Sequence, residues 1–362
     1  MRLTRLVLFL LLTSVTLMPA RPAQAEAPRD LRVAMVTGSV VRTLERALPF
    51  AARNVAVYWD GHADAQVTIA FSRDGKRFGE AIDVGRDEMG ANRNDGRTYG
   101  AMLTTLDAAV VRVRSSEPIK RLTVLGVRDR VRNVVARLLP GDPPAGPVAG
   151  APRPPIASRN DWSADESLRF NADGTEKWTP TFAPITKLIV HHTDTTNNDA
   201  NPAATVRAIY HYHAITQRWG DIGYNFLIDG SGRIYKGRNS HPPRSNADSV
   251  TGQDPQGNGV VAAHALGHNR GTVGVALLGT LTSRDATPAA RESLERLLAW
   301  VADQNDIDPY GASPYTSSSG AQSSFANIAG HRDTGRATQC PGDTFHRSLP
   351  QLRSAVAARM TR

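Results

Sequence analysis

The stretch Lys187-Leu188-Ile189-Val190-His191-His192 places an apolar run directly before two histidines. A short apolar run of this kind is typical of a buried strand. A second run, Gly-Val-Ala-Leu-Leu, occupies residues 274–278. Because successive side chains of a strand point to opposite faces, His191 and His192 cannot both enter one site from a regular strand. The stretch therefore predicts a strand that delivers one histidine to a site at its end.

Two helices are predicted next to these strands. Asn201-Pro202 and Thr287-Pro288 each supply an N-cap and a first helical residue. Apolar residues then recur on related turns, namely Val206, Ile209 and Tyr210 in the first helix and Leu294, Leu297, Leu298 and Val301 in the second. The pattern predicts an α/β domain over residues 156–362, with a mixed central sheet flanked by helices.

A different pattern precedes this domain. Apolar and polar residues alternate in residues 55–60, 67–72 and 111–114, and residues 122–127 form another short apolar run. Such short alternating segments predict strands, so we interpret residues 26–130 as a small all-β, sandwich-like domain. We find no catalytic constellation in this domain, and an accessory binding or spacing role is a hypothesis from its position. Residues 131–155 include LPGDPPAGPVAGAPRPP, which predicts an extended linker.

The N-terminus predicts export. Arg2 and Arg5 precede an apolar core over residues 6–17, and Ala23-Gln24-Ala25 is a small-residue cleavage pattern. These features are typical of a removed signal peptide, which we assign to residues 1–25. The core is shorter than the roughly 20 apolar residues that span a bilayer, so no stable membrane anchor is expected. We expect a protein that is secreted, periplasmic or associated with the cell wall.

Cys340 is the only cysteine among the 362 residues, and it lies nine positions after His331. A lone thiol can pack, undergo redox chemistry, attack a substrate or bind a metal, and the nearby histidine favours the last two. In an oxidising compartment a zinc-bound thiolate is protected, whereas an exposed thiol is a liability. Catalytic zinc takes three protein ligands and keeps a position for water. One strand-end histidine, His331 and Cys340 would supply such a set.

The charge indicates an anionic environment. The chain carries a formal charge of +9, and Arg2, Arg5 and Arg21 are removed with the signal peptide, which leaves +6. Such an excess suits an anionic polymer, and simple solubility explains it equally well. Basic runs with interleaved aromatic residues are lacking, so we do not expect nucleic-acid binding.

Several motifs after residue 156 occur together and in a characteristic order. They are Ser158-Arg159-Asn160-Asp161-Trp162, Ile189-Val190-His191-His192-Thr193, Tyr212-His213, Arg218-Trp219-Gly220-Asp221-Ile222-Gly223-Tyr224-Asn225-Phe226, Ala263-His264-Ala265, Gly274-Val275-Ala276, Gly330-His331-Arg332-Asp333 and Thr338-Gln339-Cys340-Pro341-Gly342. Together they resemble the type 2 N-acetylmuramoyl-L-alanine amidases and peptidoglycan recognition proteins, a zinc amidase family. The resemblance covers nearly the whole second domain and does not extend to the β domain.

The resemblance implies the site. It makes His191, His331 and Cys340 the ligands of one Zn²⁺ per chain, Tyr224 the catalytic tyrosine, and Thr338 a second catalytic residue at a position where phage members carry lysine. A neutral hydroxyl there can donate a hydrogen bond but cannot supply a charge. His264 matches a family histidine near the cleft, where we expect it to contact substrate or to hold a loop.

The implied function is a secreted peptidoglycan hydrolase. Zinc-activated water would cleave the amide between N-acetylmuramic acid and the L-alanine of the stem peptide, so the expected partners are muropeptides and anionic wall polymers. A non-catalytic peptidoglycan-binding protein is the alternative. Recognition-only members commonly lack the cysteine ligand, and this chain retains Cys340. In a third reading Cys340 is a nucleophile with His331 as its base.

Overall fold

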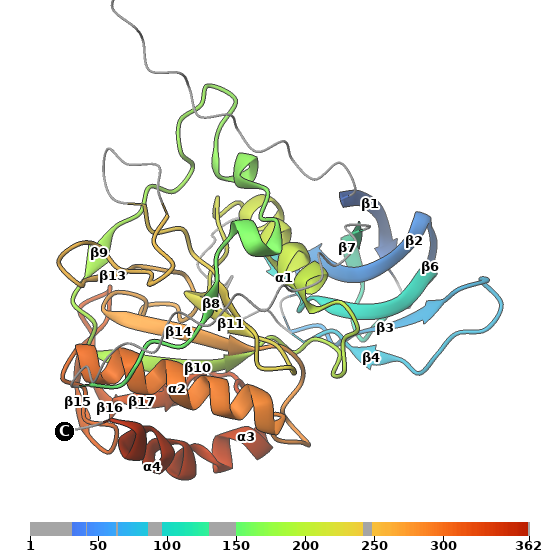
Figure 1. Ribbon diagram of the computed structural model, residues 1–362. Helices are drawn as coiled ribbons and strands as arrows, with labels where there is room; N and C mark the ends of the chain where they lie inside the picture. The colour runs from blue at the N-terminus through green and yellow to red at the C-terminus, as the bar shows by residue number, and fades with distance from the viewer. Residues whose placement is uncertain are drawn as a thin grey trace, which may run out of the picture.

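The computed structural model describes residues 31–40, 42–62, 64–85, 96–129, 150–241 and 248–360. The predicted signal peptide and most of the predicted linker lie outside these ranges. Within them the chain forms a β domain followed by an α/β domain (Figure 1). Among the described residues, no helix combines the length and the apolar character needed to cross a bilayer.

The β domain is built from antiparallel strands. They are β1 (Leu31–Val40), β2 (Thr43–Asp60), β3 (Val67–Ser72), β4 (Ile82–Asp83), β5 (Arg97–Tyr99), β6 (Leu103–Ser115) and β7 (Ile119–Asp129). The order is β1-β7-β2-β6-β3-β4, and β5 pairs with β2. The sequence predicts strands at the alternating segments and at the apolar run over residues 122–127, and β2, β3, β6 and β7 contain them.

The architecture of this domain differs from the expected two packed sheets. Its described strands join in one seven-stranded sheet. The register of β2 against β6 shifts between Ala47 and Asn54, an irregularity that bends a strand. The first half of β2 pairs with the end of β6, and its second half also pairs with β7. In a sandwich, two separate sheets would pack face to face. Here the long, bent strand β2 pairs with both β6 and β7 and so keeps the described strands in one sheet.

The α/β domain contains the predicted mixed sheet. Its strands are β8 (Ile156–Ala157), β9 (Phe182–Ala183), β10 (Lys187–His192), β11 (Phe226–Ile228), β12 (Ile234–Lys236), β13 (Gly259–Val260), β14 (Thr272–Leu277), β15 (Ala312–Thr316), β16 (Gln322–Ala326) and β17 (Ile328–Gly330). The central order is β17-β10-β14-β11-β12-β8, in which only the β11–β12 pair is antiparallel. Two further sheets have two antiparallel strands each: β9 pairs with β13, and β15 pairs with β16.

Helices cover both faces of this sheet (Figure 1). They are α1 (Pro202–His211), α2 (Pro288–Gln304), α3 (Asp343–Arg347) and α4 (Leu349–Arg359). Asn201 and Thr287 accept hydrogen bonds from the backbone N–H groups of Ala204 and Ala290, so both predicted N-caps are present. A single turn of π-helix, Tyr212–Thr216, extends α1.

The alternation of β10 separates two cores. Leu188 and Val190 pack with α2 and α4, whereas His191 lies on the α1 side. The core on the α1 side is shared, because Leu125 and Val127 of the β domain join Val206 and Ile209 of α1 in one buried cluster. The β domain therefore packs directly on the α/β domain, and Figure 1 shows it beside α1.

Candidate metal centre and cleft

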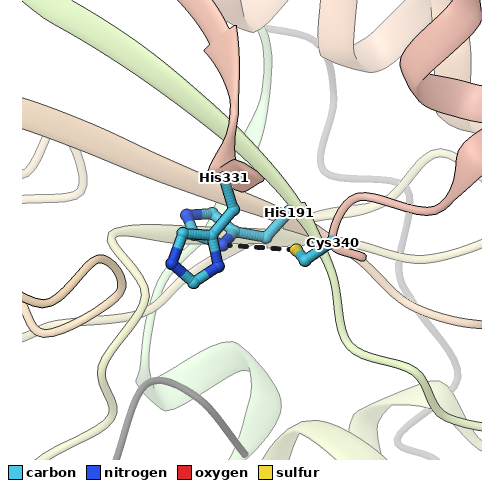
Figure 2. A group of neighbouring side chains, drawn as sticks. All are labelled: His191, His331 and Cys340. Carbon is cyan, nitrogen blue, oxygen red and sulfur yellow. Dashed lines mark hydrogen bonds between the residues drawn. The ribbon is translucent and has the colours of Figure 1, made fainter. Parts of the chain in front are cut away.

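Three predicted ligands converge at the ends of two parallel strands. His191 is the penultimate residue of β10, His331 directly follows β17, and Cys340 lies in the loop before α3. One donor atom from each residue lies within 4.8 Å of the others, and His191 Nδ1 is 3.6 Å from Cys340 Sγ (Figure 2). Tetrahedral zinc with bonds of about 2.0–2.3 Å places its donors roughly 3.3–3.8 Å apart. The donor types fit a zinc ion, and the distance between His191 Nδ1 and Cys340 Sγ falls in this range.

The burial of these donors also fits a metal. Nε2 of His331 is buried and has no hydrogen-bond partner among the residues that the structure describes. A buried polar atom without a partner is costly, and a metal ion would satisfy it. Burial lowers the pKa of His331 to about 3 and the pKa of His191 well below its usual value. Both rings are therefore neutral at pH 7, the form that binds metal.

A chain of hydrogen bonds fixes the tautomer of His191. The hydroxyl of Thr272 donates to the carbonyl oxygen of His268 (2.6 Å), so it must accept from Nε2 of His264 (3.2 Å). Nδ1 of His264 then carries a lone pair and accepts from Nε2 of His191 (3.0 Å). The remaining lone pair of His191 is on Nδ1, the atom that faces Cys340. The network presents His191 as a ligand through Nδ1.

The sequence left two roles open for His264, contact with substrate or support of a loop, and its position does not fit the substrate contact. The His264 side chain is fully buried and is not among the residues that line the cavity beside the donors. Its ring rests on β14, where a Cβ at Gly274 would lie 2.2 Å from the ring carbon Cγ. Glycine at 274 thus makes room for His264 behind His191. The sequence contains the motifs Ala263-His264-Ala265 and Gly274-Val275-Ala276, but no local pattern indicates that His264 and Gly274 are in contact.

The loop that carries Cys340 is held by its own residues. The backbone N–H of Arg332 donates to the carbonyl oxygen of Cys340 (3.0 Å), which ties the loop to the turn after His331. The Thr338 hydroxyl accepts from the N–H of Cys340 (2.9 Å). The hydroxyl proton of Thr338 is then left to donate toward the cavity that Thr338 lines.

Tyr224 also lines this cavity, which has a volume of about 390 Å³. The Tyr224 ring lies 5.5 Å from the His191 ring, centroid to centroid. The N–H of Gly223 donates to Nδ1 of His213 (3.1 Å), and the His213 ring packs against Trp219. His213 therefore positions the segment that carries Tyr224. The sequence did not assign this role, because a helical histidine has no distinctive pattern.

Comparisons with known proteins show what the α/β domain is similar to. Residues 181–343 match the N-acetylmuramoyl-L-alanine amidase family. Through this domain the chain is similar to the N-acetylmuramoyl-L-alanine amidases and the peptidoglycan-recognition proteins. The human N-acetylmuramoyl-L-alanine amidase is 31% identical over 186 residues, which cover 49% of this chain and 27% of the human protein.

Other relatives in this family differ in size. The peptidoglycan-recognition protein SC2 of Drosophila melanogaster is 29% identical over 161 residues, covering 44% of this chain and 68% of that protein. Among solved structures, the endolysin amidase LysCS of Clostridium intestinale aligns with a TM-score of 0.38 and 22% identity, over 57% of this chain and 99% of LysCS. The match spans about a quarter of the human amidase.

Proposed function

We propose that this chain is an exported, zinc-dependent N-acetylmuramoyl-L-alanine amidase. The observation that carries the proposal is the convergence of His191, His331 and Cys340 on one wall of a cavity that Tyr224 and Thr338 also line. The retained cysteine supports catalysis over recognition alone. The substrate is the muropeptide amide between the lactyl group of N-acetylmuramic acid and L-alanine, and export rests on the signal peptide predicted for residues 1–25.

Different residues would bind the metal and stabilise the developing negative charge. His191, His331 and Cys340 would hold one zinc ion, which supplies polarisation of the scissile carbonyl and a lowered pKa for water. Tyr224 lines the same cavity, and in this proposal its hydroxyl would donate to the oxygen on which negative charge develops. Thr338 offers a second, neutral donor from the loop that carries Cys340. Water adds to the carbonyl carbon, the C–N bond breaks, and the products are a lactyl carboxylate and a free L-alanine amine.

Mass spectrometry of defined muropeptides tests the proposal. We expect products with a free L-alanine amine, loss of turnover after chelation, and recovery when Zn²⁺ is added back. Binding of muropeptides without cleavage would instead identify a recognition protein. Turnover that survives chelation and stops on alkylation of Cys340 would identify a cysteine nucleophile.

The hydrogen bond behind His191 gives a separate prediction. His264→Phe keeps a ring over Gly274 but removes the acceptor for Nε2 of His191. Loss of such a partner typically lowers metal affinity by about 10–100-fold. Competition with a chromophoric chelator measures the zinc affinity. His211→Phe is the matched control, because no hydrogen bond joins His211 Nδ1 to the described residues. Equal zinc affinity in wild type and His264→Phe would contradict the tautomer assignment.

A further inference from the structure

The cavity beside the metal donors is lined by both domains. Asp83, Gly85, Ala101 and Met102 of the β domain line the same 390 Å³ cavity as the metal donors and Tyr224. We propose that the β domain is a structural wall of the substrate cleft, and that Ala101 in this wall determines which groups fit beside the scissile amide. This inference rests on the proposed function for the identity of the substrate.

The wall segment is held at both ends by the α/β domain. The hydroxyl of Tyr212, in the π-turn after α1, donates to the carbonyl oxygen of Gly100 (2.8 Å). The hydroxyl of Thr196, in the loop after β10, donates to the carbonyl oxygen of Thr104 (2.8 Å). Ala101 and Met102 lie between these two attachment points. The segment is therefore fixed relative to the elements that carry His191 and Tyr224.

The same segment is held tightly within its own domain. The N–H of Gly100 donates to the carbonyl oxygen of Val57 (2.8 Å), and the N–H of Ala101 donates to that of Val84 (3.2 Å). A Cβ at Gly100 would lie 2.2 Å from a methyl group of Val84, so only glycine allows this approach. The wall has little freedom to move away from the cavity.

Polar contacts outside the cavity fix the two domains further. Asn54 is fully buried, and its Nδ2 donates to the hydroxyls of Thr104 (3.2 Å) and Thr205 (3.3 Å). Arg207 of α1 forms a buried ion pair with Asp129 at the end of β7. Because a buried charge is costly without its partner, these pairs favour one relative placement of the domains. Such an interface argues against a β domain that acts only as a spacer.

The chemistry of the wall suits the groups next to the proposed scissile bond. A lactyl methyl and an L-alanine methyl flank that amide, and both are small and apolar. Ala101 and Met102, whose side chains are a methyl group and a thioether, line the same cavity as Thr338 and Cys340. The small side chain at 101 leaves room that a larger residue would fill. We therefore expect Ala101 to select by size.

Substitutions of increasing size at position 101 of the full-length chain test whether Ala101 borders the cleft and limits what fits in it. The variants are Ala101→Ser, Ala101→Leu and Ala101→Trp, and Leu106→Trp is the matched control because Leu106 is 77% exposed and does not line the cavity. Steady-state hydrolysis of a defined muropeptide should show kcat/KM falling by at least roughly 10-fold in Ala101→Trp and less in Ala101→Leu. Zinc content and melting temperature should stay at the values of the wild type.

A second readout does not depend on the substrate. Cys340 is the only thiol, so its reaction with a thiol reagent in the chelated protein reports access to the cavity. We expect Ala101→Trp to slow this reaction several-fold and Leu106→Trp to leave it unchanged. If the folded position-101 variants were all labelled at the wild-type rate, the proposal that the β domain forms a wall of this cavity would be wrong. Slowed labelling with undiminished hydrolysis would overturn the selection by Ala101. A wild-type protein that neither binds nor cleaves muropeptides would overturn the proposed function, whereas labelling would still decide whether the wall exists.

Discussion

Cys340→Ser should release the zinc and nearly abolish hydrolysis. A serine hydroxyl is a poor ligand compared with a thiolate, and two neutral histidines remain to hold the ion. The loss removes the group that polarises the carbonyl and activates water. We therefore expect a larger rate decrease than the roughly 10²–10³-fold that follows loss of one oxyanion donor. Zinc content from metal analysis and turnover of a defined muropeptide measure the effect.

The control for this variant is Ala337→Ser, which adds the same hydroxyl at an exposed position of the same loop. We expect both variants to keep the melting temperature of the chelated wild type, because Cys340 is only partly buried and its loop is also tied by the Arg332 backbone. Full zinc content and full turnover in Cys340→Ser would sink the ligand assignment.

Tyr224→Phe should keep the metal but slow turnover by roughly 10²–10³-fold. The ring that packs beside His191 is retained, and only the hydroxyl that could stabilise the developing oxyanion is lost. A group that acts in the transition state lowers kcat and leaves KM nearly unchanged. Steady-state kinetics with a defined muropeptide separates the two parameters.

Tyr310→Phe is the matched control, because the Tyr310 side chain is 65% exposed and does not line the cavity. It should turn over substrate at the wild-type rate. Wild-type kcat in Tyr224→Phe would remove Tyr224 from the mechanism, and a rise in KM alone would assign it to substrate binding.

Local sequence patterns predicted the main elements well. The Asn201-Pro202 and Thr287-Pro288 pairs mark the starts of α1 and α2, since capping depends on a side chain and the next few backbone N–H groups. The alternation in β10 gives His191 and His192 different hydrogen-bond partners, since Nδ1 of His192 accepts from the backbone N–H of Leu281, although both histidines line the cavity. These features depend on neighbours in the sequence, so the sequence contains enough information to predict them.

The features that the sequence did not predict depend on packing between segments far apart in the chain. The bent β2 joins the β domain into one sheet, and nothing in the alternation shows how far a strand continues through an irregularity. His264 looked like a cleft residue but lies behind His191, because Gly274 opens a space on a different strand. Described residues of the predicted linker also pack: the backbone N–H of Ala151 donates to Asp303 of α2. Each of these contacts joins segments far apart in the chain.

The sequence by itself determined the main helices and strands and, through the family resemblance that its motifs carry, indicated His191, His331 and Cys340 as candidate metal ligands. Periodicity, capping and the chemistry of imidazole and thiolate are properties of single residues and short segments. Only the tertiary structure decided which nitrogen of His191 faces Cys340 and that Ala101 borders the same cavity. Both depend on hydrogen bonds and close packing between segments separated by tens of residues or more, which no local pattern records.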